Sequence, residues 1–300
     1  MTRFAFDWVD AFTDRAFGGN GCVVVHQAEG LSIADRLALV RETSLSECAF
    51  VVGSDVADFG ARYYLADKEI LMAGHPTVAT VASLVDRGLV TLEDGRAEFT
   101  LEVGAGVLPI TVERRDGRLN VVMTQAAPQF GRAFDPAEIA AMVSLAPEDI
   151  LGAPQVVSTG SPFCITVLED KEALRRARLD VDLFYAMNPP GTPRAEVIEP
   201  FLVTLGGETE AGDTFSRLLL PPPMPAEDPF TGSATGCMGG YLWHHNLIDA
   251  PTFKAEQGHW MGRPGLAEVE VLGPRAAPTG VKVGGQGYVL MRGELELPAA

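Results

Sequence analysis

Residues 226–237 read AEDPFTGSATGC, and residues 238–247, which follow directly, read MGGYLWHHNL. An acidic pair and a proline lead into a run of small residues, after which the pattern predicts a helix. Residues 68–86, KEILMAGHPTVATVASLVD, have the same order: an extended run, a glycine turn and a helix. Almost no lysine or arginine lies near either turn. This repeated strand–turn–helix junction predicts that the chain contains two similar units.

Other segments repeat in the same order. GGNGCVVVHQA at residues 18–28 corresponds to TGSPFCITVLE at residues 159–169, and ADFGARYYLAD at 57–67 corresponds to GDTFSRLLLPP at 212–222. We therefore predict an N-terminal lobe of residues 1–124 and a C-terminal lobe of residues 125–284. A final strand near residues 285–298 is expected to return to the first lobe.

Composition excludes several classes of function. With 300 residues, 47% of them hydrophobic, the chain can build a sizeable core, and its formal net charge of −17 argues against binding to nucleic acid or to an anionic membrane. No apolar run approaches the ~20 residues that a membrane span needs, and the N-terminus has no signal-peptide core. The four cysteines are widely spaced in apolar settings, which predicts reduced thiols and a cytoplasmic protein.

The two predicted turns suggest how the protein binds a ligand. The first backbone N–H groups of a helix have no partner within the helix, and they attract carboxylate or carbonyl oxygens together with the helix dipole. Two such turns could hold a small anionic metabolite without lysine or arginine. The alternative is that each turn only joins a strand to a helix.

Several motifs occur in an order that resembles the phenazine-biosynthesis (PhzF-like) isomerases, which have the diaminopimelate-epimerase fold. They are VDAFTDRAFGGN, LSECAF, AGHPT, STGSP, EDPFTGSATGC, QGHWMGRPG and VKVGGQG. The resemblance implies an α+β fold with two pseudo-symmetric lobes, each a mixed sheet wrapped around a central helix. It also implies an active site between the lobes, a homodimer, and no metal or organic cofactor. It does not imply that the chain acts in phenazine synthesis.

The resemblance points to Glu47, in LSECAF, as the acid/base that moves a proton between carbons of the substrate. A carboxyl group among apolar neighbours such as Leu45, Ala49 and Phe50 can have its pKa raised toward neutrality. It could then both accept and return a proton. Without the resemblance, a glutamate at the start of a strand would be interpreted as a surface residue.

The resemblance also implies the residues that bind the substrate. His75 would bind or polarise it, although a histidine there could instead cap the helix. Asp228 would position the substrate or a proton-carrying group, although an aspartate there could instead brace the loop. Gly74, Gly232 and Ser233 would supply backbone and hydroxyl donors.

Two alternatives use the same cleft. Enzymes of this fold that racemise amino acids carry two thiols immediately before the glycine turns, where this chain has Ala73 and Thr231. A thiol-dependent racemase is therefore disfavoured, and Cys237 is expected to be a packing residue. The second alternative is a non-catalytic protein that binds a small molecule.

Other charged and polar residues are not expected to carry chemistry. Adjacent His244 and His245 are about 100° apart on a helix, so they cannot readily share a metal ion. His26 and His259 have no plausible partners in the sequence. The charged segment 171–180 is expected to be a solvated helix face.

The chain departs from the family pattern at several positions. Gly21 stands in GGNG where GGNP is usual, and Cys48 replaces a common threonine. Phe230 replaces a smaller alanine, and Gly265 replaces serine in GRPS. Phe230 is expected to narrow or reshape the pocket, so these changes bear on the substrate rather than on the fold.

Overall fold

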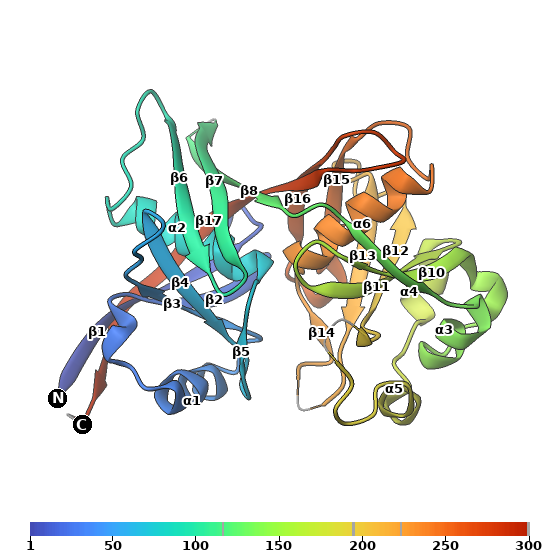
Figure 1. Cartoon of the computed structure of the whole chain (residues 1–300), viewed down its shortest axis with the longest axis horizontal. Helices are drawn as coiled ribbons and strands as arrows, with labels where there is room; N and C mark the ends of the chain where they lie inside the picture. Colours follow the sequence, from blue (N-terminus) through green and yellow to red (C-terminus); the bar gives the residue numbers. More distant parts are fainter. Residues whose placement is uncertain (116, 194–195, 223, 299–300) are drawn as a thin grey trace. The chain divides into compact units, whose positions relative to one another are not determined.

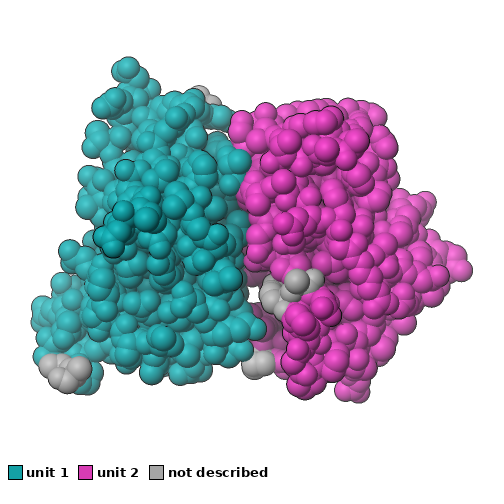
Figure 2. Space-filling view, in the orientation of Figure 1, with its two compact units in different colours: residues 1–124, 284–300 teal, residues 125–283 magenta. Residues whose placement is uncertain are grey.

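The computed structural model describes residues 1–115, 117–193, 196–222 and 224–298. The chain forms two compact units, one of residues 1–124 and 284–300 and one of residues 125–283 (Figure 2). Each unit is described by itself.

Unit 1 consists of strands around one central helix. Its strands are β1 Thr2–Ala11, β2 Asn20–Val25, β3 Cys48–Val52, β4 Phe59–Tyr64, β5 Glu69–Ile70, β6 Arg96–Val103, β7 Gly106–Arg115, β8 Arg118–Gln125 and β17 Gly280–Leu297, of which β17 begins in unit 2. Its helices are η1 Ala28–Gly30, α1 Ile33–Thr43 and α2 Gly74–Asp86.

The sheet of unit 1 is mixed. β2 pairs antiparallel with β1 and parallel with β3, β3 and β4 are antiparallel, and β4 runs parallel to β6. The series continues antiparallel through β6, β7 and β8. Because β17 pairs with both β8 and β1, the strands close into a barrel-like arrangement.

Helix α2 lies inside this arrangement and contacts β1, β2 and β3 (Figure 1). Every residue from Gly74 to Leu84 is buried. A helix that is apolar or small on all sides has no face suited to water, so the surrounding strands bury it.

Unit 2 has the same organisation. Its strands are β9 Gln129–Ala133, β10 Ile150–Ser158, β11 Pro162–Leu168, β12 Pro200–Leu205, β13 Thr214–Leu219, β14 Glu227–Asp228, β15 Thr252–Gln257 and β16 Gly265–Leu272. Its helices are α3 Pro136–Met142, η2 Pro147–Asp149, α4 Lys171–Arg176, α5 Val181–Met187, α6 Gly232–His244 and η4 His259–Met261.

The strand pairings of unit 2 repeat those of unit 1. The antiparallel pair β10–β11, the parallel pair β11–β12 and the antiparallel pair β12–β13 correspond to β1–β2, β2–β3 and β3–β4. The parallel pair β13–β15 and the antiparallel pair β15–β16 correspond to β4–β6 and β6–β7. Helix α6, buried from Gly232 to Leu242, contacts β10, β11 and β16 as the central helix (Figure 1). The predicted α+β class, with a mixed sheet around one helix in each unit, is therefore confirmed.

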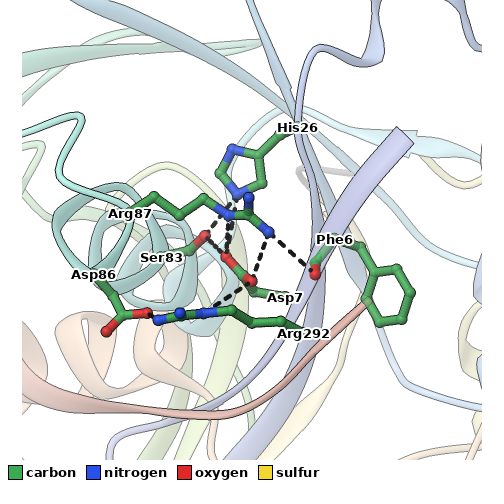
Figure 3. A network of polar contacts seen from close by, with 7 residues as sticks. All are labelled: Phe6, Asp7, His26, Ser83, Asp86, Arg87 and Arg292. Atoms are coloured by element: carbon green, nitrogen blue, oxygen red, sulfur yellow. Dashed lines mark hydrogen bonds and ion pairs between the residues drawn. The ribbon is translucent and has the colours of Figure 1, made fainter. Parts of the chain in front are cut away.

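A fully buried carboxylate ties the C-terminal end of α2 to β1 (Figure 3). Asp7 on β1 accepts hydrogen bonds from Arg87 Nε at 2.6 Å and Nη2 at 2.8 Å, and from Ser83 Oγ at 2.5 Å. Burial alone would raise the pKa of the Asp7 carboxyl. Its contacts with His26, Arg87 and Ser83, in that order of effect, outweigh burial and hold its pKa below the usual range.

The partners of His26 were not evident from the sequence, and the expectation that it has none is wrong. His26 Nε2 lies 2.7 Å from Ser83 Oγ and 3.4 Å from Asp7 Oδ2 (Figure 3). Because Ser83 gives its only proton to Asp7, His26 Nε2 must be protonated and donate to the hydroxyl. Arg292 of β17 adds a guanidinium Nε 3.8 Å from Asp7 Oδ1.

None of the helices in the described part of the chain combines the length and the hydropathy that a membrane span requires.

Candidate active site

Two polar clusters hold the residues that the sequence analysis singled out, one in each unit. We call them the Glu47 cluster (Asn20, Glu47, Gly74 and His75) and the Asp228 cluster (Asp228, Thr231, Gly232, Ser233 and Gln257). Each lies where a short strand leads into the central helix of its unit.

The Glu47 cluster forms at the ends of two neighbouring strands. β2 and β3 run parallel with Val23 opposite Cys48, so Asn20 and Glu47 lie at their N-terminal ends. His75 is the second residue of α2, and its Nδ1 is 3.7 Å from Glu47 Oε2. The side chain of His75 is 4% exposed and that of Glu47 is 20% exposed. The glutamate therefore remains accessible beside a buried imidazole, whereas an ordinary surface glutamate would be largely solvated.

Asn20 orients the imidazole. Its Nδ2 lies 3.1 Å from His75 Nδ1, and an amide nitrogen can only donate a hydrogen bond. With the amide in this orientation, Nδ1 of His75 accepts, so the proton of the neutral ring is on Nε2. Gly19, just before Asn20, has a φ of +50°, and a Cβ there would lie 2.0 Å from the carbonyl oxygen of Ala11. Only glycine can therefore bring the chain into β2 along this path.

A second set of hydrogen bonds supports the turn into α2. Thr77 Oγ1 donates to the carbonyl of Ala73 at 2.7 Å, so Tyr63 Oη donates to Thr77 Oγ1 at 2.9 Å. Burial raises the pKa of Tyr63, which keeps its hydroxyl protonated as this donor role requires. Through Thr77, Tyr63 of β4 therefore fixes the backbone just before Gly74.

The Asp228 cluster is assembled along one edge of β13. Asp228 at the end of β14 pairs with Leu218, and Gln257 at the end of β15 pairs with Ser216, two residues away on the same strand. Thr231 Oγ1 donates to Asp228 Oδ2 at 2.6 Å, so the carboxylate does brace the loop. Gln257, 1% exposed, has Oε1 3.0 Å from the Thr231 amide and Nε2 2.8 Å from the Asp228 carbonyl.

The side chain of Gln125 supports the start of α6. Its Nε2 donates to the carbonyl of Gly232 at 3.0 Å, and its Oε1 accepts from Thr159 Oγ1 at 2.6 Å. A Cβ at Gly236 would lie 1.9 Å from Gln125 Oε1, which explains a glycine inside this helix. Buried side chains therefore support Thr231 and Gly232 at the start of α6, and Ala73 just before Gly74 in unit 1.

Both central helices begin in the same way. The N-cap residue is Ala73 for α2 and Thr231 for α6. In the described structure, neither of them makes a side-chain hydrogen bond that caps its helix. The first amides of each helix therefore do not depend on an N-cap side chain, which leaves them suited to bind oxygen atoms of a ligand.

Two of the departures from the family pattern are in contact with each other. Phe230 is fully buried, and a Cβ at Gly265 would lie 2.4 Å from its ring atom Cδ2. The larger residue at position 230 is therefore accommodated by the missing side chain at position 265. The expected effect of Phe230 on the pocket stays a prediction.

The cysteines are all free and buried. Burial raises the pKa of Cys48 to about 11 and that of Cys164 to about 12, and it raises the pKa of Cys22 well above the usual range. Cys237 Sγ is 3.4 Å from the carbonyl of Ser161. Thiols that stay protonated are poor nucleophiles and poor bases.

The remaining histidines serve packing. His244 Nδ1 is 2.9 Å from the carbonyl of Arg275, and His245 Nε2 is 3.0 Å from Gln155 Oε1, so the two rings have separate partners. His259 Nε2 lies 3.5 Å from Glu256 Oε1, which corrects the expectation that it has no partner.

Sequence reasoning did not identify the side chains that hold the two clusters in place. They are Asn20, Tyr63, Gln125, Thr159 and Gln257. Asn20, Thr159 and Gln257 lie inside motifs quoted above, where a polar residue at or next to the end of a strand was the available signal. Tyr63 is on β4, and Gln125 is at the end of β8, 107 residues before Gly232.

Comparison with known proteins identifies the family. The sequence profile described as "Phenazine biosynthesis-like protein" matches residues 9–293. An uncharacterized isomerase of Clostridium acetobutylicum is 29% identical, and the match covers 96% of this chain and 97% of that protein. An uncharacterized isomerase of Escherichia coli K12 is 30% identical, and the match covers 95% of this chain and 96% of that protein. The crystal structure of a Bacillus anthracis phenazine biosynthesis protein of the PhzF family has a TM-score of 0.84 at 26% identity, covering 99% of this chain and 100% of that one. The chain therefore belongs to the phenazine biosynthesis-like protein family.

Proposed function

We propose that this chain, an isomerase of the phenazine biosynthesis-like family, moves a proton between carbons of a small anionic metabolite with Glu47 as the acid/base. The observation that carries the proposal is the contact between a partly exposed carboxylate and a buried imidazole, Glu47 Oε2 to His75 Nδ1 at 3.7 Å. No organic cofactor is required for such a step.

In the proposed reaction, Glu47 removes a proton from a carbon next to a carbonyl or another unsaturated group. Electron density then moves toward the substrate oxygen, where backbone amides at the start of α2 can stabilise the negative charge. Glu47, now protonated, returns the proton to another carbon of the same substrate. His75, with its proton on Nε2, is proposed to polarise the substrate through that donor.

The proposal assigns the Asp228 cluster to binding. Gly232 and Ser233 supply the amides and one hydroxyl, and Asp228 positions the substrate. The brace from Thr231 to Asp228 supports this role, because it fixes the orientation of the carboxylate just before the start of α6.

The experiment begins with small unsaturated carboxylic acids incubated with the enzyme in D₂O. A compound that acquires deuterium, detected by mass spectrometry, is then tested with Glu47→Gln and with Glu42→Gln, an exposed glutamate on α1 that serves as the matched control. Glu47→Gln should slow exchange by at least about 100-fold, the low end of what general acid–base catalysis contributes. Exchange at the wild-type rate in Glu47→Gln would show that another group transfers the proton.

A thiol-dependent racemase is the second candidate, because a probable proline racemase shares the fold at a TM-score of 0.67 and 14% identity. That likeness supports the fold alone. The buried thiols of Cys22, Cys48 and Cys164 have raised pKa values, which weighs against thiolate chemistry. Inactivation by iodoacetamide that a bound ligand prevents would favour this candidate over the first.

A further inference from the structure

Unit 2 contains a cavity that neither polar cluster uses. Its volume is about 640 Å³, within the range of roughly 300–1,000 Å³ typical of small-molecule sites. It is lined by the end of β13, by β14, by residues 175–181 and by Trp260 of η4. Glu227 lies in its wall, whereas the next residue, Asp228, belongs to the Asp228 cluster. Successive strand residues face opposite sides of a sheet, so the cavity and that cluster lie on different faces of β14.

The lining of the cavity carries a net positive charge, whereas the whole chain carries a net negative charge. The chain has 40 acidic and 23 basic residues, yet the lining has three arginines, Arg175, Arg178 and Arg217, against one glutamate, Glu227. Segment 171–180 was expected to be only a solvated helix face. Arg175 and Arg178 are indeed exposed, but both also line the cavity.

The guanidinium groups are held in place rather than free in solvent. Arg217, 8% exposed, pairs with both carboxylate oxygens of Glu227 and donates through Nη1 to the carbonyl of Leu174 at 2.6 Å. Arg178 Nη1 donates to the carbonyls of Arg175 at 2.8 Å and Ala177 at 2.7 Å. Arg217 is neutralised by Glu227, and Arg175 Nε lies 3.9 Å from Glu172 Oε2 in an exposed ion pair, so the positive charge of the lining comes from Arg178 and in part from Arg175.

The rest of the wall is apolar and includes an aromatic face. The guanidinium carbon of Arg175 lies 4.1 Å from the ring centroid of Trp260, and that of Arg217 lies 5.9 Å away. Trp260 Nε1 is bonded to Glu208 Oε1 at 3.0 Å, which fixes the plane of the indole. Leu219 and Met224 are among the apolar residues that complete the lining.

We propose that this cavity binds a small organic acid, with its carboxylate at Arg175 and Arg178 and an apolar body against Leu219, Met224 and the part of Trp260 that lines the cavity. Arginine side chains recognise carboxylates through paired N–H donors, and apolar side chains bind the hydrocarbon part of such an acid. The site is separate from the proton-transfer function proposed above and does not depend on it.

The test uses the full chain and benzoate as the probe. The sequence has three tryptophans, so the changes Trp8→Phe and Trp243→Phe leave Trp260 as the sole tryptophan, which is excited selectively above the absorption of tyrosine. Benzoate should change its emission saturably. Arg178→Gln should weaken binding about tenfold or more, as expected for a lost hydrogen bond to a charged group. Arg176→Gln, a neighbouring arginine that pairs with Asp149 instead, is the matched control and should leave binding unchanged.

Two further variants and a second ligand distinguish benzoate binding in this cavity from the alternatives. Ala226→Leu places a larger side chain at an exposed lining position without removing a side-chain hydrogen bond, and it should weaken benzoate binding even if Arg178→Gln folds poorly. Glu47→Gln should leave the benzoate response intact, so failure of the proton-transfer proposal does not affect this test. Equal affinities in Arg178→Gln and Arg176→Gln, or no response up to the solubility limit of benzoate, would overturn the proposal. Inorganic phosphate binding as tightly as benzoate would overturn the assignment of an apolar body.

Discussion

Restoring the family's serine at position 265 should destabilise this protein because of the phenylalanine at position 230. A Cβ on Gly265 would lie 2.4, 3.2 and 3.3 Å from three ring atoms of Phe230, whereas carbon atoms pack favourably at about 3.5–4.0 Å. The ring is fully buried and cannot move into solvent. Overpacking of this kind costs about 1–3 kcal/mol, so we expect Gly265→Ser to lower the free energy of unfolding by that amount.

The same contact predicts that the two positions are not additive. Phe230→Ala alone should cost about 3–5 kcal/mol, since it empties a buried aromatic site. In the Phe230→Ala background the clash is gone, so Gly265→Ser should cost little or should partly refill the space. The coupling free energy between the two changes should then be about 1–3 kcal/mol. The double variant should be more stable than the sum of the two single effects predicts.

Urea unfolding of the four proteins, followed by tryptophan fluorescence and circular dichroism, measures this cycle. Gly53→Ser is the control for adding a serine side chain, because the nearest atom to its Cβ is 3.7 Å away, an ordinary contact. If the effects of Phe230→Ala and Gly265→Ser add within about 0.5 kcal/mol, the two positions are independent and the reasoning from their contact is wrong.

Three further predictions follow from the buried polar groups. Asp7→Asn leaves the Arg87 guanidinium without its anion and should cost about 3–5 kcal/mol in urea unfolding, whereas a loss below about 1 kcal/mol would show that the ion pair is unimportant. The folded protein holds the pKa of Asp7 below its usual range, so ionised Asp7 adds to the free energy of unfolding above the unfolded pKa of about 3.9. This stabilisation should be lost as the pH falls below that value, and Asp7→Asn should reduce the acid dependence. Asn20→Asp replaces a donor with an acceptor, so ¹⁵N NMR should show the His75 proton on Nδ1 in place of Nε2; an unchanged tautomer would contradict the assigned amide orientation. Gln257→Leu should cost about 1–3 kcal/mol, because it leaves the Asp228 carbonyl and the Thr231 amide without a buried partner, and a thermal unfolding temperature equal to that of the wild type would contradict this.

The order of the elements and the two central helices could be predicted from local sequence. The segments that become α2 and α6 are small and apolar at nearly every position, and such helices must be buried wherever they pack. Glycine turns and β-branched runs similarly mark local backbone preferences, which depend on neighbours in the chain. The repeat of these signals predicted the repeated topology.

The candidate residues Glu47, His75 and Asp228 were named from motifs, but motifs did not reveal what holds them. Asn20 reaches His75 because α2 packs against β2, and Gln257 reaches Asp228 because β14 and β15 share one edge of β13. A register between strands depends on pairing across the sheet, which neighbouring residues in the sequence do not encode.

The sequence by itself thus determined the fold class, the repeated junction and the family, because these depend on local pattern and on motif order. Only the tertiary structure decided that Phe230 and Gly265 form one packing unit, that His26 supports Asp7, and that Arg175, Arg178 and Arg217 line one cavity. Each of these facts is a distance between atoms far apart in the chain. Such distances are set by how strands and helices pack together, and no single segment specifies them.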